Sequence, residues 1–360
     1  FEDDGSVPLL DCTQAAEKHW AAKKLPRTYL PMEGLDTYRD GVQRLVFGEQ
    51  SEAYQSKRIA TIQTLGGTGA LKVGGDLLHE AYPDSQMWIS DPAWDNHHAI
   101  FGGCGIKTNK YRYFDAQTQG VDFEGMMADL AQLPAQSFVL LHPCCHNPTG
   151  ADLSKEQWQQ LIALIKEKQL IPFLDMAYQG FGQGLDEDAY AVRAMAQAGV
   201  LFLVANSFSK NFSYYSERCG GLSVVCKDQA AAERVLGQLN AWVRKNYSNP
   251  PSHGGHAIAT VLNTPELYQG WVDAVDAMRA RIHTMRQTVY DRLTELAPHY
   301  DASYMIKQQG MFSYTGLSSE QILRLREEFG VYMLDSGRIS VPGLTTKNVE
   351  YYAKSLAAVV

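Results

Sequence analysis

The chain has 360 residues, of which 45% are hydrophobic and 20% are charged, and its formal net charge at pH 7 is −8. This length allows one large domain or two domains with a substantial core. Because the net charge is negative and the sequence has no basic tract, the composition argues against nucleic-acid binding, and the longest apolar runs are far too short to span a membrane.

The segment from about residue 57 to 227 alternates short apolar runs with helix-like stretches. The predicted strands are 87–90, 138–142, 171–175, 201–206 and 220–226. The predicted helices are 68–81, 123–133, 155–168 and 189–198. In the third of these helices, Ser154 is an N-cap candidate and Gln157 occupies the matching capping-box position. Alternation of this kind predicts an α/β fold with a parallel, doubly wound sheet.

The pattern changes after residue 227. A helix is predicted over 230–245, and apolar residues at spacings of three and four over 265–296 indicate one long helix. The remaining residues read as short strands with helices at 319–329 and 347–358. We expect a large domain over 40–275 and a smaller α+β domain made of 1–39 and 276–360.

The six cysteines lie at positions 12, 104, 144, 145, 219 and 226. Their irregular spacing, with one adjacent pair, is not typical of a disulfide framework in a chain of this length. A reducing compartment, and hence the cytoplasm, fits this usage. The sequence starts at Phe1 without a methionine and shows no signal peptide.

A lysine and an aspartate follow two of the predicted strands. Lys210 comes shortly after the apolar run 200–204, and Asp175 follows the run 171–174. A lysine amine can form a Schiff base with the aldehyde of pyridoxal phosphate, and a carboxylate can keep the pyridine nitrogen of that cofactor protonated. If both runs are parallel strands, the two groups lie at the same sheet edge, where open α/β sheets bind ligands. Pyridoxal phosphate is therefore the first cofactor hypothesis.

A glycine-rich stretch, LGGTGAL at 65–71, opens a predicted helix. Gly67 lets the backbone approach an anion, and helix N-terminal amides with the Thr68 hydroxyl can bind phosphate. Neither a Walker loop nor a dinucleotide fingerprint fits, because Leu71 precedes Lys72 and Lys72 occupies the position of the third glycine. A plain turn at the start of a helix is the alternative.

Aromatic and imidazole side chains follow the predicted strand 87–90. Trp94 could stack on a flat cofactor ring at the sheet edge, or it could be a core tryptophan. Either His97 or His98 could support the Asp175 carboxylate, although a single histidine is more often structural or exposed.

The stretch HPCCHNPTG at 142–150 follows the predicted strand 138–142. Two cysteines and two histidines make a zinc site conceivable, but adjacent cysteines lack the usual spacer between ligands. We therefore expect no metal. Asn147 before Pro148 reads better as a fixed turn that directs an amide donor at a ring oxygen of the cofactor.

Three further side chains can complete a site for this cofactor. The phenol of Tyr178 could share the ring oxygen with Asn147, or it could be a half-buried aromatic at a strand end. Arg218 could pair with a phosphate dianion or form a surface ion pair. Arg338 lies in the predicted small domain, where a guanidinium could bind a substrate carboxylate through two hydrogen bonds.

With these residues in this order, the chain resembles the class I aminotransferases of fold type I, in the aspartate and aromatic aminotransferase subgroup, from about Tyr29 to Val360. The resemblance lies in GGTGAL at 66–71, SDPAW at 90–94, HNPTG at 146–150, DMAYQGF at 175–181, SFSKNF at 207–212 and SGR at 336–338. The stretches YLPMEGL at 29–35, PCCHNPTGADL at 143–153 and MFSYTGLS at 311–318 are most similar to bacterial aromatic-amino-acid (tyrosine) aminotransferases. The resemblance implies a large domain with a mostly parallel seven-stranded sheet.

The resemblance also implies a role for each candidate residue. Lys210 would be the Schiff-base lysine and the general base, and Asp175, with His97 behind it, would bind the ring nitrogen. Arg338 would hold the substrate α-carboxylate. The remaining cofactor-binding residues would be Gly67, Thr68, Ser207, Ser209 and Arg218 around the phosphate, Asn147 and Tyr178 at the ring oxygen, and Trp94 on the ring, where Trp94 and Asn147 would also meet the substrate.

In this family the active site is shared across a homodimer. Tyr29 and Ser248 would reach the cofactor phosphate in the partner's site, and Arg244 would meet the distal carboxylate of a dicarboxylic substrate there. The implied reaction is a ping-pong transamination between tyrosine, phenylalanine or aspartate and 2-oxoglutarate. Thr68 and Asn249 resemble the aspartate-preferring members, so an aspartate aminotransferase is one alternative. A β-lyase or decarboxylase on the same fold is another, although the pair of Arg244 and Arg338 favours amino exchange.

Overall fold

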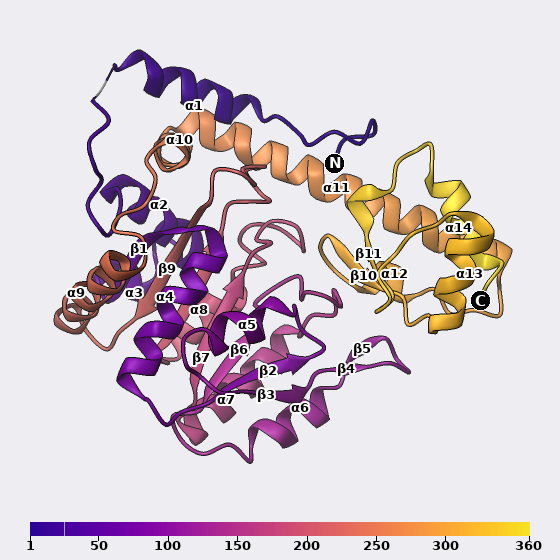
Figure 1. Cartoon of the computed structure of the whole chain (residues 1–360), viewed down its shortest axis with the longest axis horizontal. Helices are drawn as coiled ribbons and strands as arrows, with labels where there is room; N and C mark the ends of the chain where they lie inside the picture. The colour runs from indigo at the N-terminus through magenta and orange to yellow at the C-terminus, as the bar shows by residue number, and fades with distance from the viewer. Residues whose placement is uncertain (25) are drawn as a thin grey trace.

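The structure is a computed structural model that describes residues 1–24 and 26–360. Counted over these residues, the central sheet has seven strands in the order β1-β9-β8-β7-β6-β2-β3 (Figure 1). The strands are β1 (Ile59–Leu65), β2 (Met87–Asp91), β3 (Thr108–Arg112), β6 (Phe138–Leu141), β7 (Ile171–Met176), β8 (Phe202–Ser207) and β9 (Cys219–Val225). Strands β3, β2, β6, β7 and β8 are parallel, whereas β9 is antiparallel to both of its neighbours. The predicted doubly wound, mostly parallel α/β architecture is confirmed.

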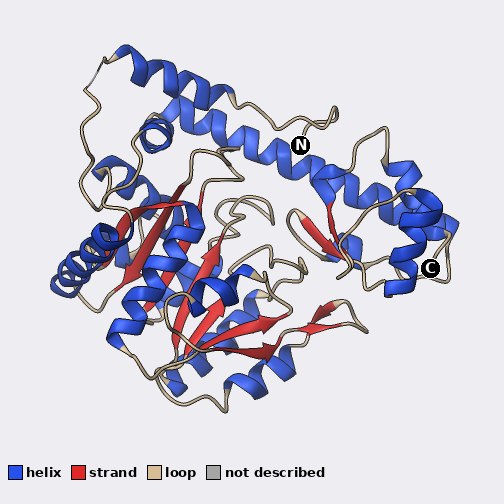
Figure 2. Ribbon diagram, in the orientation of Figure 1, coloured by secondary structure: helices blue, strands red, loops and turns tan. Residues whose placement is uncertain are grey.

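Helices cover both faces of this sheet (Figure 2). Successive side chains of a strand point to opposite faces, so Phe173 and Leu203 belong to one apolar cluster while Leu174 and Val204 belong to the other. The first cluster includes side chains of α4 (Gly66–Ala81), α5 (Asn96–Gly102) and α9 (Gln229–Asn246). The second includes side chains of α2 (Asp36–Phe47), α6 (Phe123–Leu130), α7 (Lys155–Lys168), α8 (Tyr190–Gln197) and α10 (His253–Asn263). Burial on both faces explains why the strands are nearly continuous apolar runs.

A single long helix, α11 (Pro265–Leu296), connects the sheet region with the C-terminal part of the chain (Figure 1). It packs beside α1 (Asp11–Ala22) and α10 and also against α14 (Val349–Ala357). The C-terminal part also contains α12 (Tyr304–Lys307), β10 (Phe312–Tyr314), α13 (Ser319–Phe329), β11 (Arg338–Ser340) and the 3-10 helix η1 (Val341–Gly343). Strands β10 and β11 pair antiparallel, which places Arg338 opposite Tyr314.

Three short elements complete the described structure: α3 (Glu52–Gln55), β4 (Phe114–Asp115) and β5 (Gly120–Val121). Strands β4 and β5 form their own antiparallel pair. Within the described residues, no helix has the length and apolar character needed to cross a membrane.

The predicted helices 155–168, 265–296 and 319–329 have the predicted bounds, and each predicted strand differs from the observed one by at most a residue at either end. The predicted helix 123–133 ends earlier, at Leu130, ahead of Pro134. The edge strand β3 is not among the predicted strands. Its sequence, TNKYR, lacks an apolar run. Only Tyr111 of this strand is buried, so the other positions accommodate polar side chains.

The predicted capping box of α7 is present. The Gln157 backbone N–H donates to Ser154 Oγ at 3.2 Å, and the Ser154 backbone N–H donates to Gln157 Oε1 at 2.8 Å. Two amides that the helix itself cannot satisfy therefore have partners.

Replacing the capping hydroxyl in Ser154→Ala should lower the free energy of unfolding by about 1 kcal/mol. Urea denaturation followed by circular dichroism measures this change. The control Glu167→Ala, at an exposed position of the same helix, should change it by less than about 0.5 kcal/mol. An equal loss in both variants would contradict a specific capping contribution.

Candidate active site

A cavity of about 360 Å³ lies at the carboxyl ends of β7 and β8. It brings together most of the predicted site residues, namely Gly67, Thr68, Trp94, Asn147, Asp175, Tyr178, Ser207, Ser209, Lys210, Arg218 and Arg338. Its other lining residues are Leu71, His142, Ala177, Tyr215 and Phe312. The topology explains this gathering, since the carboxyl ends of parallel strands meet at one sheet edge.

The Asp175 carboxylate is buried and has a histidine partner. Asp175 is 6% exposed, and its Oδ2 lies 2.8 Å from Nε2 of the fully buried His97. Burial alone would raise the pKa of Asp175, but the His97 hydrogen bond and the neighbouring basic groups hold that pKa below its usual value. The carboxylate therefore stays negative at neutral pH and can hold a cationic group.

Of the two adjacent histidines considered from the sequence, His97 is the one that contacts Asp175. The Nδ1 atom of His98 lies instead 3.0 Å from Oγ1 of Thr108, which belongs to the edge strand β3. His97 therefore contacts the cavity carboxylate, whereas His98 contacts the edge of the sheet.

The amine of Lys210 lies inside the same cavity, after the end of β8. Its Nζ is 5.0 Å from the centroid of the Tyr178 ring. Burial lowers the pKa of Lys210, while the charge of Asp175 opposes that shift and the charge of Arg218 adds to it. A lowered pKa increases the fraction of neutral amine, which is the form that acts as a nucleophile and as a base.

Glycines and a guanidinium form an anion cradle at the start of α4. The Cβ that an alanine would add at Gly66, where φ is +66°, would lie 2.7 Å from Nη2 of Arg218, so a side chain there would displace the guanidinium. A Cβ at Gly67 would lie 3.3 Å from Cβ of Ser207. Arg218 donates to Ser209 Oγ at 3.2 Å. This close packing of a helix N-terminus, hydroxyls and a cation suits a phosphate group.

Two aromatic side chains and an amide line the middle of the cavity. Trp94 lies edge-to-face against His97, with ring centroids 5.1 Å apart. Asn147 is buried, and its Oδ1 accepts a hydrogen bond from Nη1 of Arg338 at 2.9 Å. Burial raises the pKa of Tyr178, and the charge of Asp175 raises it further, so the phenol remains a hydrogen-bond donor at neutral pH.

Four predicted residues are not among the described side chains that line this cavity. One is His97, which contacts Asp175, and the other three are Tyr29, Arg244 and Ser248. Tyr29 is 89% exposed, and Arg244 and Ser248 are also exposed, at the end of α9 and just beyond it. Their exposure shows that these side chains do not complete the cavity of the chain that carries them.

Five lining residues were not assigned to the cofactor site from the sequence, and the surroundings of two of them, Phe312 and His142, bear on the site. Phe312 lies beside Arg338, whose Cζ is 4.4 Å from the centroid of the Phe312 ring. Both ring nitrogens of His142 are buried, and neither has a hydrogen-bond partner in the described part of the chain. Burial lowers the pKa of His142 to about 4, so this imidazole is neutral at physiological pH. The position of His142 at the end of a predicted strand could have indicated that it lines the site, but the sequence analysis considered it only as a possible zinc ligand.

The two histidines and two cysteines of 142–150 do not act as one group. His146 uses one ring nitrogen toward Ser90 Oγ at 2.9 Å and the other toward Thr149 Oγ1 at 2.8 Å. Ligand-type atoms do come within 4.8 Å of one another in two buried groups, His97 with His142 and Asp175, and Cys144 with Cys145 and Asp188. Asp175 is bonded to His97, and Asp188 accepts three backbone N–H groups of the loop 180–183. These contacts give each carboxylate a role within the protein.

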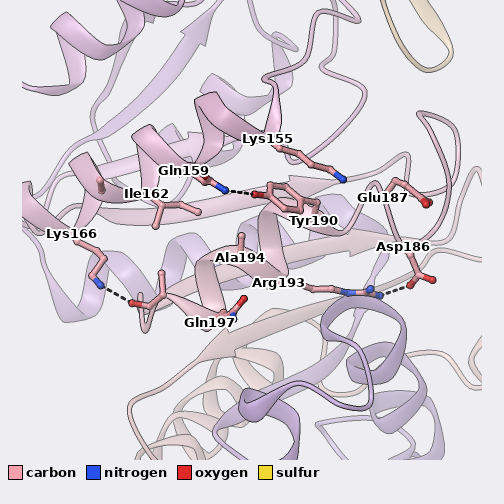
Figure 3. A pocket seen from close by; sticks show the side chains of 12 residues that line it. Lys155, Gln159, Ile162, Lys166, Asp186, Glu187, Tyr190, Arg193, Ala194 and Gln197 are labelled. Carbon is pink, nitrogen blue, oxygen red and sulfur yellow. Dashed lines mark hydrogen bonds and ion pairs between the residues drawn. The ribbon is translucent and has the colours of Figure 1, made fainter.

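A larger groove of about 840 Å³ lies between α7 and α8 and shares no lining residue with the cavity described above (Figure 3). Its charged side chains have partners of their own, such as Arg193 with Asp186 at 2.7 Å and Lys166 with the Ala198 carbonyl at 2.9 Å. The groove is open surface between two helices, so its size does not make it the reactive site.

The residues of the smaller cavity fit pyridoxal phosphate by their chemistry. A cradle without room for added side chains, a buried carboxylate that stays ionised, a partly buried lysine of lowered pKa and a flat aromatic face lie around one space. These groups match the phosphate, ring nitrogen, aldehyde and ring face of that cofactor in turn. Arg338 remains for a carboxylate of the substrate.

Comparisons with known proteins agree with this fit. The family model described as "Aminotransferase class I and II" matches residues 2–356. The tyrosine aminotransferase of Klebsiella pneumoniae is 55% identical over the whole chain and 91% of its own length, and an aspartate aminotransferase of Pseudomonas aeruginosa is 47% identical over the whole chain and 90% of its own. The crystal structure of an aromatic-amino-acid aminotransferase from Burkholderia pseudomallei, covalently bound to pyridoxal phosphate, superimposes with a TM-score of 0.98 at 47% identity, covering all of this chain and 90% of that one.

The lowered pKa of Lys210 leads to a prediction about the stability of the cofactor-free protein. Because the pKa of Lys210 is lowered on folding, the unfolded chain binds the additional proton below the usual pKa of 10.5, and wild-type stability falls as pH drops from there. Lys210→Met removes this penalty. The variant should melt above wild type at about pH 7, and the difference should shrink toward about pH 10.

Differential scanning fluorimetry of both proteins across this pH range measures the effect. The matched control Lys227→Met, at an exposed position after β9, should show no such pH-dependent gain. A Lys210→Met variant that melts below wild type at neutral pH would contradict the lowered pKa.

Proposed function

The chain belongs to the aminotransferase class I and II family, and we propose that it transfers the amino group of an aromatic amino acid, tyrosine or phenylalanine, or of aspartate, to 2-oxoglutarate. The observation that carries the proposal is the single cavity that holds Lys210, Asp175 and Arg338 together. The greater identity to a relative named tyrosine aminotransferase than to one named aspartate aminotransferase supports the aromatic substrates.

Pyridoxal 5'-phosphate is the cofactor, and when bound it supplies an electron sink that makes the Cα proton of an amino acid removable. Asp175, kept ionised and oriented by His97, holds the ring nitrogen. Trp94 covers the ring face, and Asn147 and Tyr178 bind the ring oxygen. The phosphate is held by Gly67, Thr68, Ser207, Ser209 and Arg218.

Lys210 acts as the general base and general acid of the reaction. Its burial beside Arg218 favours the neutral amine. This amine can accept the proton from the Cα of the donor amino acid and, in the second half of the exchange, deliver a proton to the Cα of the acceptor keto acid. The negative charge of Asp175 acts in the opposite direction, but burial and Arg218 outweigh it.

Arg338 binds the substrate α-carboxylate. A guanidinium can hold a carboxylate through two parallel hydrogen bonds. Its Nη1 donates to Asn147 at 2.9 Å, so the amide fixes one side of the guanidinium. Trp94 and Asn147 line the cavity on the side of the cofactor ring, where they meet the substrate as well.

We also propose a homodimer with shared sites. In it, Tyr29 and Ser248 of one protomer reach the cofactor phosphate of its partner, and Arg244 meets the distal carboxylate of a dicarboxylic substrate. The exposure of these three side chains on one chain supports this assignment, since they are available to a neighbour.

The structure also supports a proposal for the domain division and one for the cellular location. We propose that residues 40–275 form the large cofactor-binding domain and that 1–39 with 276–360 form a small domain that closes on the substrate. The course of α11 between the two regions supports this division (Figure 1). A cytoplasmic location is supported by the six buried cysteines, each with a free thiol.

An aspartate-preferring aminotransferase is the second candidate, and the similarity to aspartate aminotransferases favours it. A β-lyase or decarboxylase would use the same Lys210 and Asp175 but would break another bond. Initial rates with tyrosine, phenylalanine and aspartate as donors and 2-oxoglutarate as acceptor separate these candidates. Glutamate should form with each donor, and kcat/KM should be highest for an aromatic one; ammonia or carbon dioxide release in place of glutamate would overturn the proposal.

The two substrate classes place opposite demands on Arg244. A substrate carboxylate pairs with this guanidinium, whereas an aromatic ring would leave it without a partner, which is costly if it stays buried. Arg244 should therefore swing out or stay hydrated when tyrosine binds. In Arg244→Leu, kcat/KM for aspartate should fall about 100-fold, while that for tyrosine changes less than about threefold.

Steady-state kinetics with both donors measures this divergence. The control Arg234→Leu, at another exposed position of α9, should leave both values within about twofold of wild type. Equal losses of tyrosine and aspartate turnover in Arg244→Leu would contradict the swinging arginine.

A further inference from the structure

Arg286, in the middle of α11, is a buried cation whose partners are backbone carbonyls. The residue is 2% exposed. Its Nη1 donates to the carbonyl of Met305 at 3.0 Å, and its Nη2 donates to the carbonyls of Gly310 at 2.9 Å and Phe312 at 2.6 Å. One guanidinium thus holds three points of a single segment, 305–312.

The energetic cost of this arrangement suggests more than a contribution to stability. Burial lowers the pKa of Arg286 to about 10, which still leaves the guanidinium charged at neutral pH. Taking a charged side chain out of water is costly unless well-placed hydrogen bonds compensate for the lost solvent. Because the buried guanidinium of Arg286 donates to three backbone carbonyls, it restricts the conformation of the segment 305–312 that contains them.

That segment packs backbone-to-backbone against the turn that carries Asn147. The Gln309 N–H donates to the Gly150 carbonyl at 2.6 Å. A Cβ added at Gly310 would lie 2.6 Å from Cβ of Cys145. The segment therefore has little freedom to move along the turn, and its position is set by Arg286 on one side and by the turn on the other.

The segment ends at the aromatic ring beside the carboxylate-binding arginine. The Phe312 ring lies 4.4 Å from Cζ of Arg338 and edge-to-face against Tyr178, with ring centroids 5.8 Å apart. Arg338 in turn donates to Asn147. The ring and the amide that surround the Arg338 guanidinium thus lie on two packed pieces of backbone, one of which Arg286 holds directly.

We propose that Arg286 is a positioning residue for Arg338. By fixing the carbonyl of Phe312, it fixes the ring against which the guanidinium of Arg338 lies, and so sets the geometry for a substrate carboxylate. Arg286 does not itself line the cavity. This inference rests on the proposed role of Arg338 in carboxylate binding.

A double-mutant cycle tests this path in the full-length protein loaded with pyridoxal phosphate. The variants are Arg286→Lys, Phe312→Leu and the double variant, and the probe is succinate, a dicarboxylate that cannot transfer an amino group. Each single variant should weaken succinate binding about tenfold, and the double variant should lose no more than the weaker-binding single variant, because the two residues act in series. For tyrosine, KM should rise more than kcat falls, and the dissociation constant of pyridoxal phosphate should stay within about threefold of wild type.

Arg292→Lys is the matched control. Arg292 lies on the same helix, but it pairs with Glu350 at 2.7 Å in place of loop carbonyls. Its succinate affinity should stay within about twofold of wild type. If succinate affinity falls in Arg286→Lys but not in Arg292→Lys, the loss comes from the contacts of Arg286 with the segment 305–312. It is then not a general effect of replacing an arginine of α11 by lysine.

Several outcomes would overturn the proposal. These are wild-type succinate affinity in folded Arg286→Lys, losses that add in the double variant, or a loss of cofactor affinity as large as the loss of succinate affinity. If Arg286→Lys does not fold, Phe312→Leu decides, since unchanged succinate binding there would break the path to Arg338. A wild-type protein that binds neither pyridoxal phosphate nor succinate would instead refute the proposed function.

Discussion

The hydrogen bond between His97 and Asp175 is the constraint on which the rest of the site depends. It lies at the carboxyl end of β7, where burial raises the pKa of the carboxyl group and the hydrogen bond lowers it. With the charge retained, an anion lies in a cavity that Lys210, Arg218 and Arg338 also line. The charge of Asp175 raises the pKa of Lys210, but burial and the charge of Arg218 outweigh it, so the pKa of Lys210 lies below its usual value.

The site also depends on bringing two regions of the chain together. The sheet supplies the cofactor side, through the ends of β7 and β8 and the start of α4, whereas the C-terminal region supplies Arg338 and Phe312. The hydrogen bond from Arg338 to Asn147 joins the two. The proposed chemistry on the cofactor and the proposed recognition of the substrate carboxylate therefore lie on separate elements, which would allow the substrate to vary while the reaction stays the same.

The sequence predicted those parts of the site that follow from sheet topology. Asp175 and Lys210 could be placed together because polar residues after buried parallel strands meet at one edge, and the bounds of α7, α11 and α13 followed from caps and apolar spacing. The contacts of Phe312 with Arg338 could not be predicted, because they join positions far apart in the chain and carry no local pattern. The edge strand β3 was missed for a different reason: its side chains are mostly not buried, so the apolar signal is absent. The roles that we propose for Tyr29, Arg244 and Ser248 involve a second protomer, and no local pattern in the sequence points to such a contact.

The most direct test of this account is the absorption spectrum of the purified protein reconstituted with pyridoxal phosphate. A yellow band should appear, bleach when tyrosine is added alone, and return when 2-oxoglutarate is added after removal of the tyrosine. That cycle would show cofactor binding by Lys210 and both halves of the amino exchange in one sample. A band that tyrosine, phenylalanine and aspartate all leave unchanged would contradict the central claim that this cavity exchanges amino groups.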